Sequence, residues 1–197
     1  MSARLFDPIT LRSLTVRNRI WLSPMCQYSA VDGVPDDWHL VHLGARATGG
    51  FGLVLTEAAG VTPEGRISPQ DAGIWNDEQA EAWSRIFAFA HAQGAATGVQ
   101  LAHAGRKAST YRPWADSSGT VPAEQGGWTT SAPSAVAFDG YAEPAAMSLD
   151  EIADVVTAFA DAAVRSLAAG ADRDRGAGVA TGGDVDEVDT VLSQQAA

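Results

Sequence analysis

The chain has 197 residues, of which 46% are hydrophobic and 19% charged, and a formal net charge of −11, a composition typical of a globular protein. The negative charge argues against nucleic-acid binding, which needs a positive surface, and the longest apolar runs fall far below the roughly 20 residues of a membrane-spanning helix. Because the single cysteine cannot form an internal disulfide and the N-terminus lacks a signal-peptide core, we expect a reducing, cytoplasmic compartment.

The first elements expected are a hairpin and a short buried strand. Apolar and polar positions alternate within residues 4–18, and the apolar run Ile20–Leu22 is then stopped by Pro24. Cys26 and Tyr28 follow directly. In a barrel of alternating strands and helices this end of a strand carries the chemistry, so a thiol and a phenol placed here can contact a bound ring. The alternative is that Cys26 is a small buried hydrophobic residue and Tyr28 an ordinary edge residue.

A first helix is expected to begin at Asp36 or Asp37, either of which can cap it, and to end near Thr48. Its inward face should consist of apolar side chains at helical spacing, namely Trp38, Val41 and Ala45. His39 and His42 lie three residues apart on the same helix. Since no carboxylates accompany them at metal-ligand spacing, they indicate a solvated or partner-bonded face rather than a metal site.

Two further strands and a second helix follow. Residues 52–57 form a continuously apolar strand, as expected when both faces of a parallel sheet are covered. A loop over 58–75 leads into a helix over about 76–94, and residues 97–101 form a third strand with Gln100 at its end. The apolar residues of this helix repeat at a spacing of about 3.6: Ala80, Trp83, Phe87 and Ala90.

A long irregular stretch, residues 102–147, precedes the last helix. Its aromatic residues favour an ordered lid or rim: Tyr111, Trp114, Trp128, Phe138 and Tyr141. Ser148 and Glu151 then form a capping box for a helix that ends at Gly170. One face of that helix is expected to carry Ile152, Val155, Val156, Phe159, Ala163 and Leu167. Three strand–helix units in succession predict a parallel α/β architecture.

Several of these stretches, in this order and with this spacing, resemble the Old Yellow Enzyme family, in particular the bacterial xenobiotic reductases and thermophilic-like ene-reductases. The resemblance covers residues 4 to about 172. The stretches that carry it are Leu5-Phe6-Asp7-Pro8-Ile9, Arg17-Asn18-Arg19-Ile20, Ser23-Pro24-Met25-Cys26-Gln27-Tyr28, Thr56-Glu57-Ala58, Pro63-Glu64-Gly65-Arg66-Ile67, Gly73-Ile74-Trp75, Gln100-Leu101-Ala102-His103-Ala104-Gly105-Arg106-Lys107 and Ala132-Pro133-Ser134.

The resemblance implies a fold, a cofactor and a reaction. The fold would be an α/β, incomplete (β/α)8 TIM barrel comprising about the first three to four βα units, with FMN at its C-terminal face. The reaction would be the reduction of an activated C=C bond, with NADPH or NADH as the reductant and a small electrophilic alkene such as an enone as the substrate. Family members pair their barrels in some cases, which implies a homo-oligomer for the intact enzyme.

Individual site residues are also implied by the resemblance. Ser23, Pro24, Met25 and Cys26 would line the flavin, with Cys26 near the reactive edge of the ring, where a thiol can tune its potential. Tyr28 would contact the substrate, Ala58 would offer its backbone to the ring, and Gln100 would hydrogen-bond the pyrimidine edge. The alternatives are that Ala58 is small only because of a tight approach and that Gln100 caps a sheet end. No role is assigned to His103 or Arg106, and no metal is expected.

The resemblance stops after Asp172. The family continues with a fourth strand that ends in a His-x-x-His or His-x-x-Asn pair, which holds the substrate carbonyl, and with a tyrosine that supplies a proton. This sequence has no histidine after His103. We therefore expect two regions: residues 1–172 as the N-terminal part of a flavin-binding barrel, and residues 173–197 as a non-homologous, disordered tail poor in apolar residues.

The start of this tail suggests a frameshift. Residues 173–177 can be encoded as CGT GAT CGA GGT GCA, and the same bases one nucleotide later encode Val-Ile-Glu-Val and the start of a His codon. Resequencing of the gene tests this hypothesis. The alternative to the family activity is accordingly a truncated, catalytically inactive remnant that does not hold FMN stably.

Overall fold

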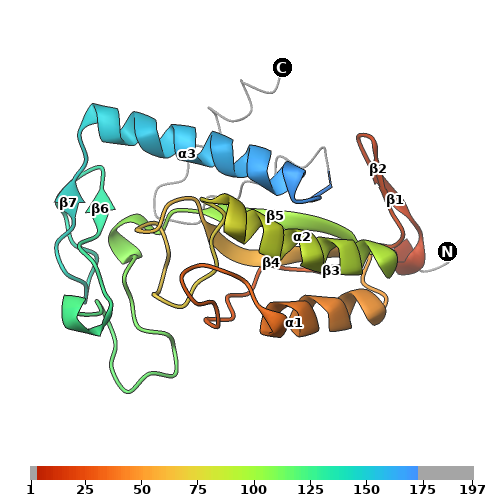
Figure 1. Cartoon of the computed structure of the whole chain (residues 1–197), viewed down its shortest axis with the longest axis horizontal. Coiled ribbons are helices and arrows are strands. Elements are labelled where there is room, and N and C mark those ends of the chain that lie inside the picture. The colour runs from red at the N-terminus through yellow and green to blue at the C-terminus, as the bar shows by residue number, and fades with distance from the viewer. Residues whose placement is uncertain (1–3, 173–197) are drawn as a thin grey trace.

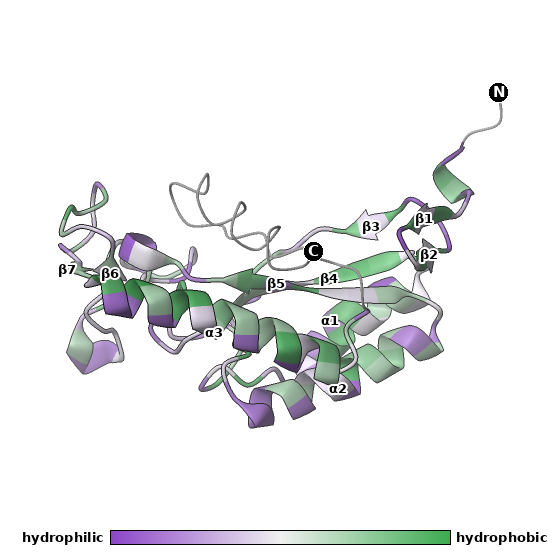
Figure 2. Cartoon of the chain, turned by 90° about the horizontal axis from the view of Figure 1, so that it is seen from above, coloured by the Kyte–Doolittle hydropathy of each residue, from purple (hydrophilic) through white to green (hydrophobic). Residues whose placement is uncertain are grey.

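The computed structural model describes residues 4–172, and a parallel sheet of three strands lies at its centre (Figure 1). The strands are β3 (Trp21–Leu22), β4 (Leu53–Gly60) and β5 (Ala96–Ala102), hydrogen-bonded in that order. The helices that follow them are α1 (Asp37–Thr48), α2 (Asp77–Ala92) and α3 (Leu149–Ala168), and all three lie on the same face of the sheet (Figure 2). The strand–helix alternation predicted from the sequence is therefore confirmed.

The remaining elements lie at the two ends of this sheet. At one end is an antiparallel hairpin, made of β1 (Ile9–Leu11) and β2 (Leu14–Val16) after the short 3-10 helix η1 (Arg4–Phe6). The long stretch after β5 contains 3-10 turns and a short two-stranded sheet at the opposite end in Figure 1: η2 (Gly105–Lys107), η3 (Ala123–Gln125), β6 (Ser131–Ala132) and β7 (Ala145–Ala146).

The hydrophobic core lies between the sheet and its helices. Trp83 and Phe87 of α2 are almost completely buried and stack with ring centroids 5.7 Å apart. Trp83 Nε1 donates to the Gly73 carbonyl at 3.0 Å, so burial of the indole leaves no unpaired donor. Burying each such side chain contributes about 2–3 kcal/mol. The predicted α2 face is thereby confirmed.

The side chain of Arg17 connects the hairpin to the first two helices. Its guanidinium donates to the carbonyls of Ala47 (2.9 Å), Phe51 (2.8 Å) and Gln93 (2.7 Å), which lie at or just beyond the C-terminal ends of α1 and α2. The negative ends of both helix dipoles meet one permanent positive charge here. Arg17 therefore fixes the two helices at the end of the sheet away from the strand C-termini.

The inward face of α1 differs from the prediction. Trp38 and Val41 are 55% and 66% exposed and Ala45 is also exposed. The helix is instead rotated so that its buried face carries His39, Leu43, Gly44 and Ala47. The apolar pattern alone misplaced this face because a histidine with polar partners occupies its first buried position.

Two smaller expectations also change, and a third is not tested. Leu167 of α3 is 46% exposed, since Phe159, Ala162 and Ser166 form the fully buried positions of that helix. The loop expected to begin at residue 58 begins later, because β4 continues to Gly60. The predictions for residues 173–197 fall outside the described residues.

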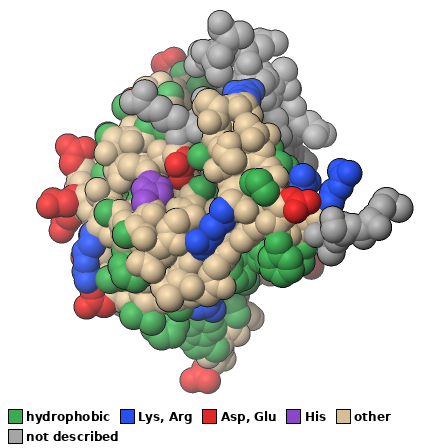
Figure 3. Space-filling model, turned by 90° about the vertical axis from the view of Figure 1, so that its right-hand side faces the viewer, with side chains coloured by type: hydrophobic (Ala, Val, Ile, Leu, Met, Phe, Trp, Pro, Cys, Tyr) green, Lys and Arg blue, Asp and Glu red, His purple; other side chains and the backbone are tan. Residues whose placement is uncertain are grey.

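Within residues 4–172, none of the helices combines the length and the apolar content that crossing a bilayer requires. On the face shown in Figure 3, basic side chains are separated from one another by acidic, apolar and uncharged groups.

Candidate functional site

The loop after β3 places the predicted residues Ser23 to Tyr28 at the C-terminal end of that strand. Ser23 and Met25 are exposed, whereas Pro24, Cys26 and Tyr28 are half-buried. Tyr28 has a φ of 53°, a left-handed conformation that is uncommon for an aromatic residue and that tends to occur at functional sites. Its ring meets Trp114 of the long loop edge-on, with centroids 5.3 Å apart.

Cys26, Ala58 and Gln100 come together at the strand ends. Ala58 and Gln100 are direct partners in the β4–β5 register, each two residues before the end of its strand. The Ala58 backbone hydrogen-bonds the Cys26 sulfur, and the Gln100 N–H donates to Thr56 Oγ1 at 3.2 Å. Three residues separated by 32 and 42 positions in the sequence therefore share one corner of the sheet. The β4–β5 register shift between Leu55 and Ala58 lies at this corner.

Two buried carboxylates, which sequence reasoning missed, lie beside Cys26. The ligand-type atoms of Cys26, Glu57 and Asp71 all lie within 4.8 Å of one another. Glu57 accepts the Gln27 N–H at 2.9 Å, and Asp71 accepts the Ser68 N–H and hydroxyl, both at 3.0 Å. Glu57 could have been noticed as a charged residue inside an apolar strand, whereas Asp71 has no comparable signal in its loop.

Glu57 is paired with a buried histidine of α1. His39 Nε2 lies 3.0 Å from Glu57 Oε1, and both side chains are almost completely buried. The other ring nitrogen, Nδ1, lies 2.8 Å from Asp36 Oδ1, at the N-cap of the same helix. The Nε2–Oε1 contact has the distance of an ion pair but is poorly aligned as a hydrogen bond, so we regard it as electrostatic.

Burial and negative charge set the protonation of this corner. Burial, followed by the charges of Asp71 and Glu57, raises the pKa of Cys26 to about 12, so the thiol is protonated at neutral pH. Burial also raises the pKa of Asp71 to about 6, against the lowering effect of its bonds from Ser68.

The two remaining titratable groups of the site also shift. Burial is the main cause that raises the pKa of Tyr28 to about 12. For His39, burial alone would lower the pKa, but the bonds and charges of Glu57 and Asp36 outweigh it and raise the pKa overall. The imidazolium form of His39 is thereby favoured between its two carboxylates.

His103 and Arg106, to which no role was assigned, lie just after β5. His103 Nδ1 accepts the Gly105 N–H at 3.2 Å, and burial lowers the pKa of the ring. Its Nε2 is buried without a hydrogen-bond partner among residues 4–172. Arg106 makes one long contact, 3.4 Å, with Ser134 Oγ. These contacts indicate packing beneath the long loop.

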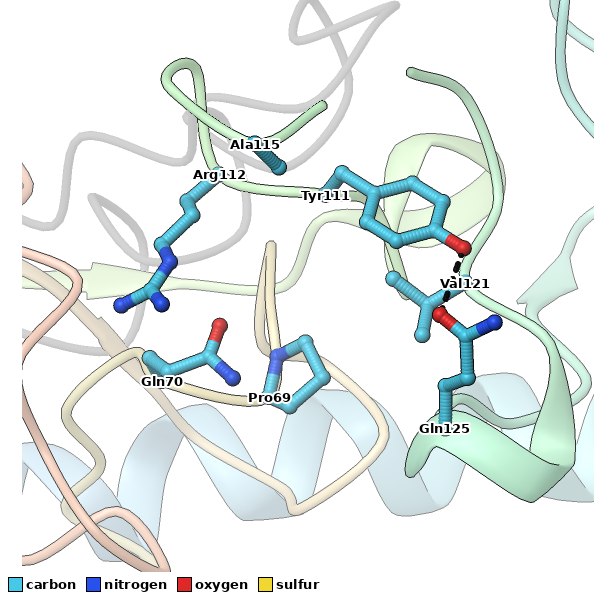
Figure 4. Close-up of a pocket in the computed structure, with 7 residues that line it drawn as sticks. All are labelled: Pro69, Gln70, Tyr111, Arg112, Ala115, Val121 and Gln125. Atoms are coloured by element: carbon cyan, nitrogen blue, oxygen red, sulfur yellow. Dashed lines mark hydrogen bonds between the residues drawn. The ribbon is translucent and has the colours of Figure 1, made fainter. Parts of the chain in front are cut away.

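A separate cavity of about 210 Å³ lies between the loop after β4 and the long loop (Figure 4). Its lining residues are Pro69, Gln70, Tyr111, Arg112, Ala115, Val121 and Gln125. The Tyr111 hydroxyl donates to Gln125 Oε1 at 2.9 Å, and the Arg112 guanidinium extends toward Gln70. None of the predicted site residues lines this cavity.

Comparison with known proteins gives consistent matches. The model of a family described as "NADH:flavin oxidoreductase / NADH oxidase family" matches residues 4–173. An NADH:flavin oxidoreductase of Gibberella zeae is 45% identical over 175 residues, covering 87% of this chain and 42% of the relative. An NADPH dehydrogenase of Bacillus cytotoxicus is 44% identical over 175 residues, and the match covers 87% of this chain and 46% of the dehydrogenase.

Solved structures agree with these matches. A structure of morphinone reductase in complex with tetrahydroNAD superimposes with a TM-score of 0.73 at 29% identity, over 87% of this chain and 48% of that one. An old yellow enzyme homologue from Zymomonas mobilis gives a TM-score of 0.71 at 34% identity, and the match covers 86% of this chain and 47% of that one. The chain thus spans less than half the length of these relatives, and its α/β fold corresponds to part of their barrel.

Proposed function

The chain belongs to the NADH:flavin oxidoreductase / NADH oxidase family, and from this premise we propose that it supplies the flavin-binding corner of an FMN-dependent NAD(P)H oxidoreductase that reduces activated C=C bonds. The observation that carries the proposal is the meeting of Cys26, Ala58 and Gln100 at the ends of neighbouring strands. Strand C-termini are where barrel enzymes of this kind hold their ligands.

The residues at this corner fit a flat heteroaromatic ring. The Gln100 amide can both donate and accept, which matches the pyrimidine edge of a flavin. Ala58 adds only a methyl group beside its backbone, which permits close approach, and Met25 leaves 46% of its surface open to a ligand. Cys26 offers a neutral, polarisable thiol. When bound, FMN would supply the hydride chemistry between NAD(P)H and an electron-poor alkene.

Tyr28 and Trp114 are proposed to form the entrance for the substrate. Their rings meet edge-on, and the raised pKa of Tyr28 keeps its phenol protonated and able to donate. A small electrophilic alkene would be held between this pair and the ring. In the family, the groups that hold the substrate carbonyl and protonate it come after the position of residue 172, and this sequence has no histidine after His103 and no tyrosine after Tyr141.

Flavin binding by the full 197-residue chain tests the proposal. The purified chain is mixed with FMN, separated from free FMN by gel filtration, and examined for visible flavin absorption. Gln100→Ala should weaken FMN binding about tenfold, as for one hydrogen bond worth about 1.4 kcal/mol. Gln93→Ala is the matched control, since Gln93 lies near the opposite end of β5 and only its backbone carbonyl is used by Arg17.

Activity is then measured as oxidation of NADPH or NADH that depends on an added enone. A yellow chain that reduces the enone supports the whole proposal. Bound FMN without enone reduction would overturn the part that concerns C=C bonds. A colourless chain with no affinity for FMN would contradict the proposal and support the alternative, an inactive remnant.

A further inference from the structure

The His39–Glu57 ion pair connects helix α1 to the strand-end corner. Both side chains are almost completely buried, and a buried carboxylate is tolerated only when it is paired. On one side of the pair, His39 also contacts Asp36, the partly exposed N-cap of α1. On the other side, Glu57 accepts the Gln27 N–H and lies beside Cys26. A chain of contacts therefore runs from the start of a helix to the loop after β3.

The histidine keeps its partners in both protonation states. As an imidazolium, Nδ1–H can donate to Asp36 Oδ1 at 2.8 Å while Nε2–H faces Glu57. As a neutral ring with the proton on Nε2, Nδ1 can accept the Asp36 backbone N–H at 3.0 Å. Either way Nε2 carries a proton toward Glu57, so the buried carboxylate keeps a partner.

Glu57 acts on the loop through its two oxygens. Oε1 faces His39, and Oε2 accepts the Gln27 N–H at 2.9 Å, which ties the residue next to Cys26 to strand β4. The carboxylate also lies within 4.8 Å of the Cys26 sulfur. A negative charge at this distance disfavours a thiolate. The charged groups that face Cys26 are Asp71 and Glu57. The titratable groups around Glu57 are His39 and His42 of α1, Asp71 of the loop after β4, and Cys26 and Tyr28 of the loop after β3.

We infer that His39 and Glu57 are positioning residues for the loop that carries Cys26: the paired carboxylate holds the Gln27 amide and places its negative charge beside the Cys26 side chain. The consequence for the cofactor rests on the proposed function. A fixed negative charge behind the thiol would disfavour additional negative charge on a ring bound in front of it. Glu57 would thus influence the flavin through Cys26 without touching it.

The reactivity of the thiol tests this inference without any flavin. Since Cys26 is the only cysteine, alkylation of the full chain by iodoacetamide reports on this one site. A pKa of about 12 in place of 9.0 leaves about 10³-fold less thiolate, so the native chain should react about 10³-fold more slowly than the same chain in urea. Glu57→Gln keeps the shape and removes the charge, and should speed the native reaction severalfold, since burial and Asp71 continue to disfavour the thiolate.

His39→Gln distinguishes an effect of charge on the alkylation rate from an effect of looser packing. It keeps an N–H donor toward Glu57 but removes the positive charge, so the reaction should be as slow as in the wild type or slower. If the two residues only stabilised the fold, both substitutions would loosen the loop and speed alkylation. Glu81→Gln on the exposed face of α2 is the matched control, and it should react like the wild type.

The inference is overturned if native wild-type Cys26 reacts as fast as in urea, if Glu57→Gln stays within twofold of the wild type, or if His39→Gln is accelerated. Circular dichroism establishes which variants fold. If Glu57→Gln fails to fold, slow alkylation of Cys26 in folded His39→Gln supports the inference. The ratio of alkylation rates of native and urea-unfolded wild type tests it independently. Failure of the chain to bind FMN would contradict the proposed function but leave these results unaffected.

Discussion

Replacement of Asp71 by asparagine should make the protein more stable near neutral pH, and by a predictable amount. Asp71 is 1% exposed, and its burial raises the pKa from 3.8 to about 6. The folded state therefore binds this proton more tightly than the unfolded state. Its contribution to stability is fully present below about pH 3.8 and is lost as the pH rises through about 6. The pKa in the folded state exceeds the ordinary value by 6 − 3.8, or about 2.2 pH units. At about 1.36 kcal/mol per unit, ionising the buried carboxyl costs the folded state about 3 kcal/mol of stability.

Asparagine removes this titration and keeps the local bonds, since its carbonyl oxygen can accept the Ser68 N–H and its amide can donate to the Ser68 hydroxyl. Urea unfolding of the wild type and Asp71→Asn is measured between about pH 4 and pH 7. The free energy of unfolding of the variant minus that of the wild type should rise by about 2.4 kcal/mol across this range, since part of the effect has already developed at pH 4. A flat or falling difference would refute the idea that this carboxylate is buried at a cost. Asp139→Asn, at an exposed loop position, is the control.

Two further predictions concern the scaffold of the site. Arg17→Met should lower the free energy of unfolding by about 2 kcal/mol, because carbonyls at two helix ends lose a charged donor. The exposed Arg19→Met should change it little, and equal effects of the two would contradict this assignment. Ser148→Ala should cost about 1 kcal/mol through loss of the α3 cap, seen as a lower Tm, whereas Ser148→Asp should retain the cap. A Tm unchanged by the alanine substitution would argue against the cap.

Local signals predicted most of the elements, because they depend on neighbours in the sequence. Residue type and spacing predicted a cap at Asp36 or Asp37 for α1, a start near residue 76 for α2 and the capping box of Ser148 and Glu151 for α3. The structure has these caps at Asp36, Asn76 and Ser148. Strands β4 and β5 were found from continuous apolar runs, each to within a few residues. These features form within one or two turns of chain, so a short window of sequence contains their causes.

The rotation of α1 could not be predicted in the same way. Trp38 and Val41 are apolar residues of its first turns and are exposed, yet His39 between them is buried. The reason lies 18 residues later, where Glu57 supplies the charge that makes burial of an imidazole favourable. Hydrophobic periodicity assigns no value to such a pair, and so it placed the wrong face toward the sheet.

The sequence by itself determined that this chain alternates parallel strands with capped helices, and its motifs placed it in a flavin oxidoreductase family. Only the tertiary structure decided that Ala58 pairs with Gln100, that Cys26 lies against both Glu57 and Asp71, and that His39 supports them from α1. The physical reason is that strand register and buried charge pairing are set by contacts between distant segments. Their energies depend on burial and distance, which exist only after the segments have packed together.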